Sequence, residues 1–380
     1  MNKALIVTSV ASMVDQFLLP SIALLKDMGY TVEVACNFEN GSTCSRERID
    51  DLKNRLDASG VRYYQIDFAR SVLHISQHIR AYKQIKAILS GGEYALMHCH
   101  SPIGGMLARL ACRKARKQGT KVFYTAHGFH FYKGAPLKNW LLYYPVEKYC
   151  ARLTDVLITI NKEDYALAQK KLKAKRVEYV PGVGVDLTKF GQVTVEKAEK
   201  RKELGVPEDA ILLLSVGELN KNKNHETVIR AVAELPETNV YYFIAGKGDL
   251  REHLQSVIDE AGLTERVKLL GYRSDVAELY RVADVYVLPS VREGLNVSVM
   301  EAMAGSLPCV VSKIRGNTDL IDENGGALFD PLSVENCKRA IESIFSRKKE
   351  DLGRYNREKI EKMSVEEINA RLRDFYSESK

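Results

Sequence analysis

The chain has 380 residues, of which 45% are apolar and 28% are charged, a balance that is ordinary for a water-soluble globular protein. No apolar run approaches the roughly 20 residues that a membrane-spanning helix needs. Seven cysteines without a Cys-x-x-Cys pair argue against a disulfide framework or a zinc site. We therefore expect a cytoplasmic protein, and its length predicts two domains.

Charge is distributed unevenly along the chain. Residues 1–190 contain 28 Lys and Arg and 16 Asp and Glu, a net charge of +12, whereas the remainder has 28 and 33, a net charge of −5. Basic clusters lie at Arg113–Lys117, at Lys170–Arg176 and within Arg70–Leu89. These clusters are either solvated helix faces or a surface for anionic lipid. They lack interleaved aromatic residues, so we expect no nucleic-acid partner.

Strand and helix patterns alternate along the whole chain, which predicts an α/β fold of parallel sheets covered by helices. The N-terminal stretch reads as a first strand and helix and not as a signal peptide. The first series of expected strands is Ala4–Ser9, Thr31–Cys36, Arg62–Ile66, Ala95–Cys99, Val122–Ala126, Asp155–Ile160 and Val177–Val180. The second series is Ile211–Val216, Val240–Ala245, Val267–Leu270, Asp284–Leu288 and Cys309–Ser312.

Two series of strands predict two doubly wound domains. The break falls in the stretch Pro181–Phe190, which is rich in Gly and Pro and has little periodicity. We expect an N-terminal domain over residues 1–185 and a C-terminal domain over residues 186–363, followed by a helical segment over 364–380.

Ligands of such folds bind at the carboxyl ends of the strands, and the first series offers several candidate residues there. His127 directly follows a strand and precedes a glycine, and His130 lies in the same loop. His98 and His100 resemble a metal cluster, but alternation along a strand places Cys99 on the opposite face. We expect a structural or acceptor-side role for these two histidines. Small residues follow the first strand, namely Ser9, Ala11 and Ser12.

The second series carries cationic and glycine-rich loops at its strand ends. Gly217 permits a tight turn after the strand Ile211–Val216, and Lys221 and Lys223 can reach toward a phosphate. A glycine turn follows the next strand at Gly246-Lys247-Gly248, and Gly271-Tyr272-Arg273 follows the one after it.

The most informative segment runs from Ala283 to Ser312 and predicts a strand, a loop, a helix over about 295–304 and a second strand. Two glutamates lie eight residues apart, Glu293 in the loop and Glu301 in the helix. The backbone N–H groups of Gly294, Leu295 and Asn296 fall where a helix leaves its donors unpaired, which attracts phosphate. This arrangement suits a ligand with a diphosphate and several hydroxyls, such as a sugar nucleotide.

The sequence PSVREGLNVSVMEAMAGSLPCVVS within this segment resembles the signature of the family 4 retaining glycosyltransferases, and bacterial capsular and exopolysaccharide members in particular. The resemblance extends from Ala4 to about Phe329. It implies a GT-B fold, with two Rossmann-like domains facing each other across a cleft. It also implies that the segment 364–380 crosses back onto the N-terminal domain.

The resemblance assigns roles to the candidate residues of the C-terminal domain. It implies that Glu301 binds the ribose hydroxyls and that Glu293 holds hydroxyls of the transferred sugar. The amides of Gly294 to Asn296, with Lys223, stabilise the departing diphosphate. The nucleotide base lies near the backbone of Tyr272 and Arg273.

In the N-terminal domain, the resemblance places His127 at the donor sugar or the reacting centre. The family often has two glycines after the first strand, where this chain has Ser9, Ala11 and Ser12, so Ser12 is expected near the diphosphate. The chain also carries Glu218 where many members carry a basic residue, so Lys223 acts alone or with Arg315 or Lys221.

The expected reaction moves a sugar, weighted by family toward a UDP-sugar, to a hydroxyl of a lipid-linked or glycan acceptor. Asp-x-Asp is absent from the chain, so we expect neither a metal nor another cofactor. The basic N-terminal half is expected to bring the protein to the inner face of an anionic membrane. Two alternatives remain: a nucleotide-sugar 2-epimerase of the same architecture, and a binding partner that lacks turnover.

Overall fold

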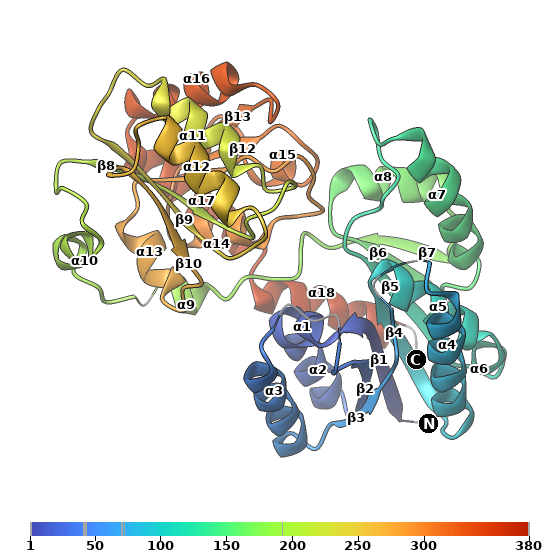
Figure 1. Cartoon of the computed structure of the whole chain (residues 1–380). Coiled ribbons are helices and arrows are strands. Elements are labelled where there is room, and N and C mark those ends of the chain that lie inside the picture. Colours follow the sequence, from blue (N-terminus) through green and yellow to red (C-terminus); the bar gives the residue numbers. More distant parts are fainter. Residues whose placement is uncertain (1, 41–43, 70, 72, 192, 379–380) are drawn as a thin grey trace. The chain divides into compact units, whose positions relative to one another are not determined.

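The computed structural model describes residues 2–40, 44–69, 71, 73–191 and 193–378. The chain divides into two compact units (Figure 1). The N-terminal unit comprises Met1–Gly184 together with Ile368–Lys380, and the C-terminal unit comprises Val185–Glu367. The division therefore falls within one residue of the expected boundary at residue 185, and most of the final helix belongs to the N-terminal unit.

Within the described residues, the N-terminal unit contains a seven-stranded sheet with the order β3-β2-β1-β4-β5-β6-β7. All its pairings are parallel. The strands are β1 (Lys3–Val10), β2 (Thr31–Asn37), β3 (Arg62–Gln65), β4 (Tyr94–His100), β5 (Lys121–Ala126), β6 (Val156–Thr159) and β7 (Arg176–Tyr179). The order reverses between β1 and β4, which is where folds of this kind bind ligands.

Helices cover both faces of this sheet. One buried cluster joins β1 and β2 to α1 (Ala11–Met13), the π-helix η1 (Val14–Leu18), α2 (Leu19–Asp27), α3 (Arg46–Ala58) and α18 (Val365–Ser377). A second joins the other face to α4 (Ile75–Ser90), α5 (Pro102–Ala111), α7 (Leu137–Ala151) and α8 (Lys162–Lys171). The short helix α6 (Arg113–Lys117) follows α5.

The C-terminal unit contains a six-stranded parallel sheet with the order β10-β9-β8-β11-β12-β13 in its described residues. The strands are β8 (Ile211–Val216), β9 (Val240–Ala245), β10 (Val267–Gly271), β11 (Val285–Leu288), β12 (Cys309–Ser312) and β13 (Gly326–Phe329). Its order reverses between β8 and β11, so this unit has a switch point of its own.

The helices of this unit are α9 (Leu187–Gly191), α10 (Lys197–Leu204), α11 (His225–Ala233), α12 (Arg251–Glu260), α13 (Val276–Val282), α14 (Val297–Ala304), α15 (Asn317–Leu320), α16 (Val334–Phe345) and α17 (Lys349–Glu361). Side chains of α11, α12 and α16 pack on one face of the sheet in a single buried cluster. Among the described residues, no helix is both long and apolar enough to cross a membrane.

The prediction of parallel sheets is confirmed, but Ser9, which was expected to follow the first strand, lies within it. Strand β1 continues to Val10 and α1 begins at Ala11, so the chain passes directly from strand to helix. None of these residues is a glycine, and Ala11 and Ser12 are buried in the first helical turn.

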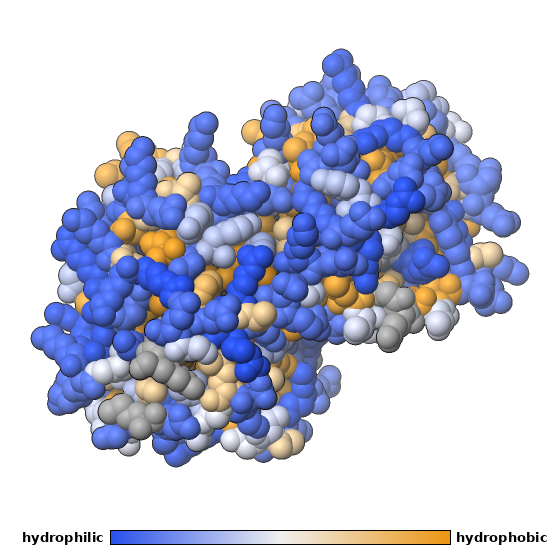
Figure 2. Space-filling model, turned by 180° about the vertical axis from the view of Figure 1, so that it is seen from behind, coloured by the Kyte–Doolittle hydropathy of each residue, from blue (hydrophilic) through white to orange (hydrophobic). Residues whose placement is uncertain are grey.

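The surface seen from the side opposite to Figure 1 is mostly hydrophilic, with apolar residues in smaller groups (Figure 2).

Candidate active site

The switch point of the C-terminal unit brings the predicted cation and the first predicted carboxylate together. Lys223 follows β8 and Glu293 follows β11, and the Lys223 Nζ lies 2.8 Å from the Glu293 Oε1. Both side chains are largely buried, with 17% and 13% of their surface exposed. A Lys ammonium has three donors, so Lys223 can keep this contact and still donate to a phosphate oxygen.

Hydrogen bonds hold the two loops that carry this pair against each other. The N–H of Val291 donates to the carbonyl of Asn222 at 2.9 Å, and the Asn222 side chain donates to the Arg292 carbonyl at 3.0 Å. Asn224 adopts a left-handed backbone with φ of 54° and donates to the Pro289 carbonyl at 3.2 Å. The relative position of lysine and glutamate is therefore fixed by backbone contacts as well as by their own ion pair.

A second cation lies beside the glutamate loop. The buried Arg315 donates from Nε to the Glu293 carbonyl at 3.1 Å. Of the cations expected to assist Lys223, the structure places Arg315 next to this loop, whereas Lys221 is exposed. Glu218 is exposed and accepts a hydrogen bond from Asn220 at 2.8 Å.

Helix α14 begins at Val297, two residues later than the expected start near Leu295. The delay has a local cause, because Asn296 is the N-cap and its Oδ1 accepts the N–H of Val299 at 3.2 Å. Within the described residues, no acceptor receives the N–H groups of Gly294, Leu295 or Asn296. These three amides remain available to an anion beside the Lys223–Glu293 pair.

Glu301 lies on α14, partly buried, and burial raises the pKa of its carboxyl group. Lys189 and a hydrogen bond from the Tyr280 hydroxyl to its Oε2 at 3.2 Å oppose that shift. A carboxylate in this position gains from further hydrogen-bond donors, and the hydroxyls of a ribose would supply them.

Two glycines, Gly246 and Gly248, allow close backbone approach next to β8. A Cβ at Gly246 would lie 1.8 Å from the Gly217 carbonyl oxygen, and one at Gly248 would lie 2.3 Å from the Leu219 carbonyl oxygen. The Gly246-Lys247-Gly248 turn therefore packs closely against the backbone that follows β8. The side chain of Tyr272, in the loop after β10, is 61% exposed.

The side chain of Arg273 is engaged within the protein. Its Nε donates to Asp275 at 2.7 Å, and Asp275 also pairs with Lys200 at 2.8 Å. If a nucleotide base binds in this region as expected, it would therefore contact backbone atoms and the exposed Tyr272 side chain, and not the Arg273 guanidinium.

In the N-terminal unit, the switch point is closed by small side chains. The Ser9 hydroxyl, at the end of β1, lies 2.7 Å from the Ser101 hydroxyl after β4 and accepts the N–H of Gly104 at 3.0 Å. Ser101 has a left-handed backbone with φ of 62°. Ser12, which was expected near the diphosphate, is 7% exposed in the first turn of α1.

Three histidines form a line at the carboxyl ends of β4 and β5. The His100 Nδ1 lies 3.1 Å from the His127 Nε2, and the His98 and His100 rings have centroids 4.2 Å apart. His98 exchanges hydrogen bonds with Tyr376 at 2.7 Å and Thr125 at 2.8 Å. Burial lowers the pKa of His127 to about 4, so its imidazole is neutral at neutral pH.

Cys99 lies on the other face of β4 from these histidines, as alternation predicted, and its thiol donates to the Phe123 carbonyl. His130 stacks near Tyr143 with ring centroids 4.7 Å apart. Among the described residues, no group of three His, Cys, Asp or Glu side chains converges to hold a metal ion.

Sequence reasoning missed several residues that shape the site. Tyr280 binds Glu301, and buried His225 lies next in sequence to Asn224 with its Nδ1 3.3 Å from the Tyr242 hydroxyl. His225 follows the lysine loop directly, which is a local signal. Tyr280 lies on another helix, and nothing in the sequence near Glu301 identifies it.

Two family descriptions match the two halves of the chain. "Glycosyltransferase Family 4" matches residues 22–189 and "Glycosyl transferases group 1" matches residues 196–360. With two doubly wound units and polar residues at each switch point, they define a glycosyltransferase with the GT-B fold. The chain is 37% identical over 368 residues to the glycosyltransferase EpsD of Bacillus subtilis (strain 168), covering 95% of this chain and 92% of EpsD. It belongs to glycosyltransferase family 4.

A second relative is the UDP-Gal:alpha-D-GlcNAc-diphosphoundecaprenol alpha-1,3-galactosyltransferase of Escherichia coli, 30% identical over 76% of each chain. Two solved structures share the fold. Anabaena Alr3699/HepE, in complex with UDP and glucose, has a TM-score of 0.79 at 18% identity, and the match covers 100% of this chain and 100% of that chain. Sucrose-phosphate synthase from Thermosynechococcus elongatus has a TM-score of 0.79 at 20% identity, with 99% of this chain and 98% of that chain covered.

Proposed function

We propose that this glycosyltransferase moves a sugar from a UDP-sugar to a hydroxyl of a lipid-linked acceptor in surface polysaccharide synthesis, with retention of the anomeric configuration. The observation that carries the proposal is the Lys223–Glu293 pair at the switch point of the C-terminal unit, next to the amides of residues 294–296. The names of the Escherichia coli relative and of the Anabaena complex support a uridine nucleotide and a prenyl-diphosphate acceptor.

The donor is proposed to bind through two carboxylates with different tasks. Glu301, held by Tyr280, accepts hydrogen bonds from the ribose hydroxyls. Glu293 accepts hydrogen bonds from hydroxyls of the transferred sugar while it retains the contact with Lys223. Both carboxylates are limited in exposure, so each hydrogen bond forms where water competes poorly.

The departing diphosphate develops negative charge as the glycosidic bond breaks. Lys223 and the amides of residues 294–296 are proposed to stabilise that charge, with Arg315 as the neighbouring cation. These groups supply positive potential from fixed positions, because the loops that carry them are joined by backbone hydrogen bonds. We therefore propose a reaction that needs no divalent metal.

His127 is proposed to contact the donor sugar or the reacting centre. Its low pKa keeps the imidazole neutral, so it offers one donor or one acceptor and no positive charge. The His100 Nδ1 fixes the orientation of the ring through the 3.1 Å contact with its Nε2.

The decisive experiment starts with a thermal-shift panel of UDP, GDP and ADP sugars, because a ligand that binds only the folded state raises the melting temperature. The donor so identified is then incubated with a sugar-diphosphate-prenyl acceptor, and the anomeric configuration of the product is read by NMR. We expect a UDP-sugar to give the largest shift and a retained anomer to form. Conversion of the donor sugar without acceptor would instead establish an epimerase, and a shift without any turnover would establish a binding protein.

A further inference from the structure

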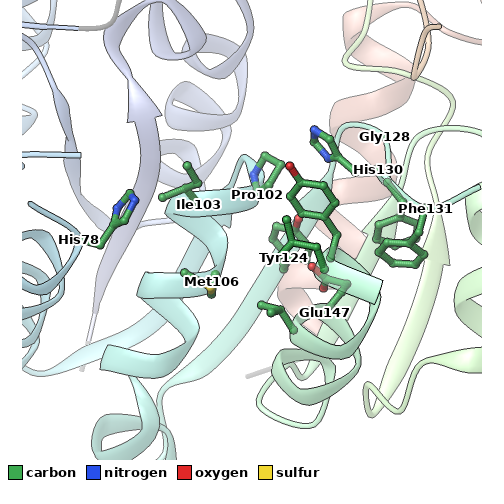
Figure 3. A pocket seen from close by; sticks show the side chains of 13 residues that line it. His78, Pro102, Ile103, Met106, Tyr124, Gly128, His130, Phe131 and Glu147 are labelled. Carbon is green, nitrogen blue, oxygen red and sulfur yellow. The ribbon is translucent and has the colours of Figure 1, made fainter. Parts of the chain in front are cut away.

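An apolar cavity of about 190 Å³ lies in the N-terminal unit at the carboxyl ends of β4 and β5 (Figure 3). Its wall comes from the start of α5, the loop that follows His127, and the middle of α7. The lining side chains that the argument uses are Ile103, Met106, Tyr124, Phe131, Leu142 and Val146. A cavity of about 150 Å³ lined by apolar groups holds benzene, so this one has room for a branched hydrocarbon unit.

The charged groups at this cavity satisfy each other. Glu147 lines it, and both of its carboxylate oxygens accept hydrogen bonds from the Arg109 guanidinium, at 2.6 and 3.1 Å. Arg109 is fully buried and stacks over the ring of Tyr124 at 3.8 Å from its centroid. Because the ion pair is closed, neither of its charges is left for an occupant; apart from the tyrosines, His78 and His130 are the other titratable side chains of the lining.

Exposed apolar side chains continue from the cavity onto the surface of α7. Leu137, Leu141 and Leu142 are 73%, 70% and 55% exposed, and Leu142 also lines the cavity. Such a group on a helix surface is characteristic of contact with a partner or a lipid phase. Lys138 and Lys148 are the exposed charges of this helix, which suits an anionic lipid.

The chain fixes the position of the cavity relative to His127, within the N-terminal unit. Gly128 lines the cavity and directly follows His127. The wall of the cavity that Gly128 forms is therefore next in the chain to the last residue of the histidine line. The basic helix α6 lies at the other end of the sheet, because Arg116 binds Asp155 just before β6 begins and Thr120 precedes β5.

We propose that this cavity binds the isoprenoid segment next to the diphosphate of the acceptor lipid, with the exposed leucines of α7 in contact with the rest of the chain. The inference rests on the proposed function, since the lipid-linked acceptor supplies the isoprenoid. It assigns acceptor binding to α5, α7 and the loop 128–131, and not to the basic cluster Arg113–Lys117.

The test uses the full-length protein and Trp140, the single tryptophan of the chain, as reporter. The Trp140 ring centroid lies 5.6 Å from that of Phe131, which lines the cavity. Farnesyl diphosphate is titrated while the tryptophan fluorescence is recorded. We expect a saturable change with farnesyl diphosphate and none with inorganic diphosphate. A response to inorganic diphosphate alone, or equal binding of n-dodecyl phosphate, would overturn the isoprenoid assignment.

Leu142→Asn and Leu141→Asn form a matched pair, because the two leucines are adjacent and exposed but Leu142 alone of the two lines the cavity. We expect Leu142→Asn to weaken farnesyl diphosphate binding about tenfold and Leu141→Asn to change it less than about twofold. Val146→Asn is a second cavity variant, and circular dichroism checks that each variant is folded. Equal effects of Leu142→Asn and Leu141→Asn would overturn the proposal.

Transfer assays separate this proposal from the proposed function. If Leu142→Asn transfers sugar to a prenyl-linked acceptor at the wild-type KM, the cavity assignment fails and the proposed function stands. If the wild-type protein binds farnesyl diphosphate but transfers sugar to no lipid-linked acceptor, the proposed function fails and the cavity assignment stands.

Discussion

The His100 Nδ1 lies 3.1 Å from the His127 Nε2, so two imidazoles share one proton at the carboxyl ends of β4 and β5. His100 is 3% exposed, and no described residue accepts from or donates to its Nε2. Burial lowers the pKa of His100 well below 6.5 and that of His98 to about 3. Protonation of any member of this line brings a positive charge into a buried site, which makes the region sensitive to acid.

The first prediction is that the protein loses stability below pH 6.5. Between pH 6.5 and about 4 the unfolded chain binds a proton at residue 127 and the folded chain does not, so the free energy of unfolding falls as the pH falls. His127 alone is expected to contribute about 1–2 kcal/mol of loss between pH 7 and pH 5. Urea denaturation at pH 7, 6 and 5 measures it.

The matched variants for this prediction are His127→Gln and His74→Gln. His74 is exposed at the N-cap of α4 and lies outside the histidine line, so His74→Gln is the surface control. His127→Gln should make the pH dependence shallower, and His98 and His100 should carry part of what remains. A slope that is identical in wild type and His127→Gln would show that this residue does not bind its proton differently in the two states.

The second prediction concerns the ribose. Glu301→Ala should weaken nucleotide binding by about 1–3 kcal/mol, because a charged hydrogen bond in a partly buried site is lost. Calorimetric titration of folded protein with UDP measures the change, and Glu301→Gln, which keeps one acceptor oxygen, should lose less. Unchanged affinity in Glu301→Ala would remove this carboxylate from the nucleotide site.

The third prediction separates two lysines of one loop. Lys223→Ala should lower kcat by about tenfold to a hundredfold, since it removes a cation from the departing diphosphate. Lys221→Ala is the control, because this side chain is exposed and two residues away. Glu293→Ala should also lower turnover more than nucleotide affinity. Equal kcat values for the two lysine variants would contradict the proposed role of Lys223.

The fourth prediction is that activity persists in excess chelator, since fixed amides and cations are proposed to carry the diphosphate charge. Initial rates with and without EDTA test it. A loss of more than about tenfold, or about 1.4 kcal/mol of barrier, that magnesium or manganese restores would refute the proposal of a metal-independent reaction.

The fifth prediction concerns membrane binding, which the +12 charge of residues 1–190 motivates. We expect the protein to bind anionic vesicles in sedimentation assays, and to bind them less as salt rises. The basic surfaces expected to take part are Arg113–Lys117 and the segment Arg70–Leu89, of which Arg70 and Val72 lie outside the described residues. Failure to bind at low salt would leave these residues as solvated surface.

The structure refines the variant for this test. Arg116 donates two hydrogen bonds to Asp155, at 3.0 and 2.9 Å, so its reversal would place two carboxylates together and destabilise the unit. Arg113, Lys114 and Lys117 are exposed and can be changed to Glu without that cost. The triple variant should weaken vesicle binding without abolishing it, because the exposed leucines and lysines of α7 remain, while UDP binding is unchanged.

Strand positions could be predicted because parallel strands buried on both faces appear as continuous apolar runs. Strand β13, Gly326–Phe329, escaped prediction because it begins at a glycine, which interrupts the apolar pattern. The topology also allowed us to predict that Lys223 and Glu293 lie in the same region, since the strands that precede them meet at a switch point. Their direct ion pair was not predictable, because it depends on the conformation of two irregular loops.

Contacts between side chains of elements that are far apart in the chain could not be predicted from the sequence. Tyr280 reaches Glu301 from another helix, and Tyr376 reaches His98 across 278 positions of the chain. The cavity depends on how α5 and α7 pack around Arg109 and Glu147. In the sequence these two residues are charged, so they do not indicate that an apolar cavity lies beside them.

The contact between His98 and Tyr376 has a consequence for how the protein is made. Ile368, Leu372 and Phe375 lie with Tyr376 in the buried cluster of the N-terminal unit. During synthesis this unit emerges first, yet its core stays incomplete until the last helix has left the ribosome. The C-terminal unit, synthesised second, is one contiguous range, Val185–Glu367, so its core does not wait for the segment that begins at Ile368. A stalled ribosome would therefore hold a partly open N-terminal sheet, and chaperones would meet that surface throughout translation.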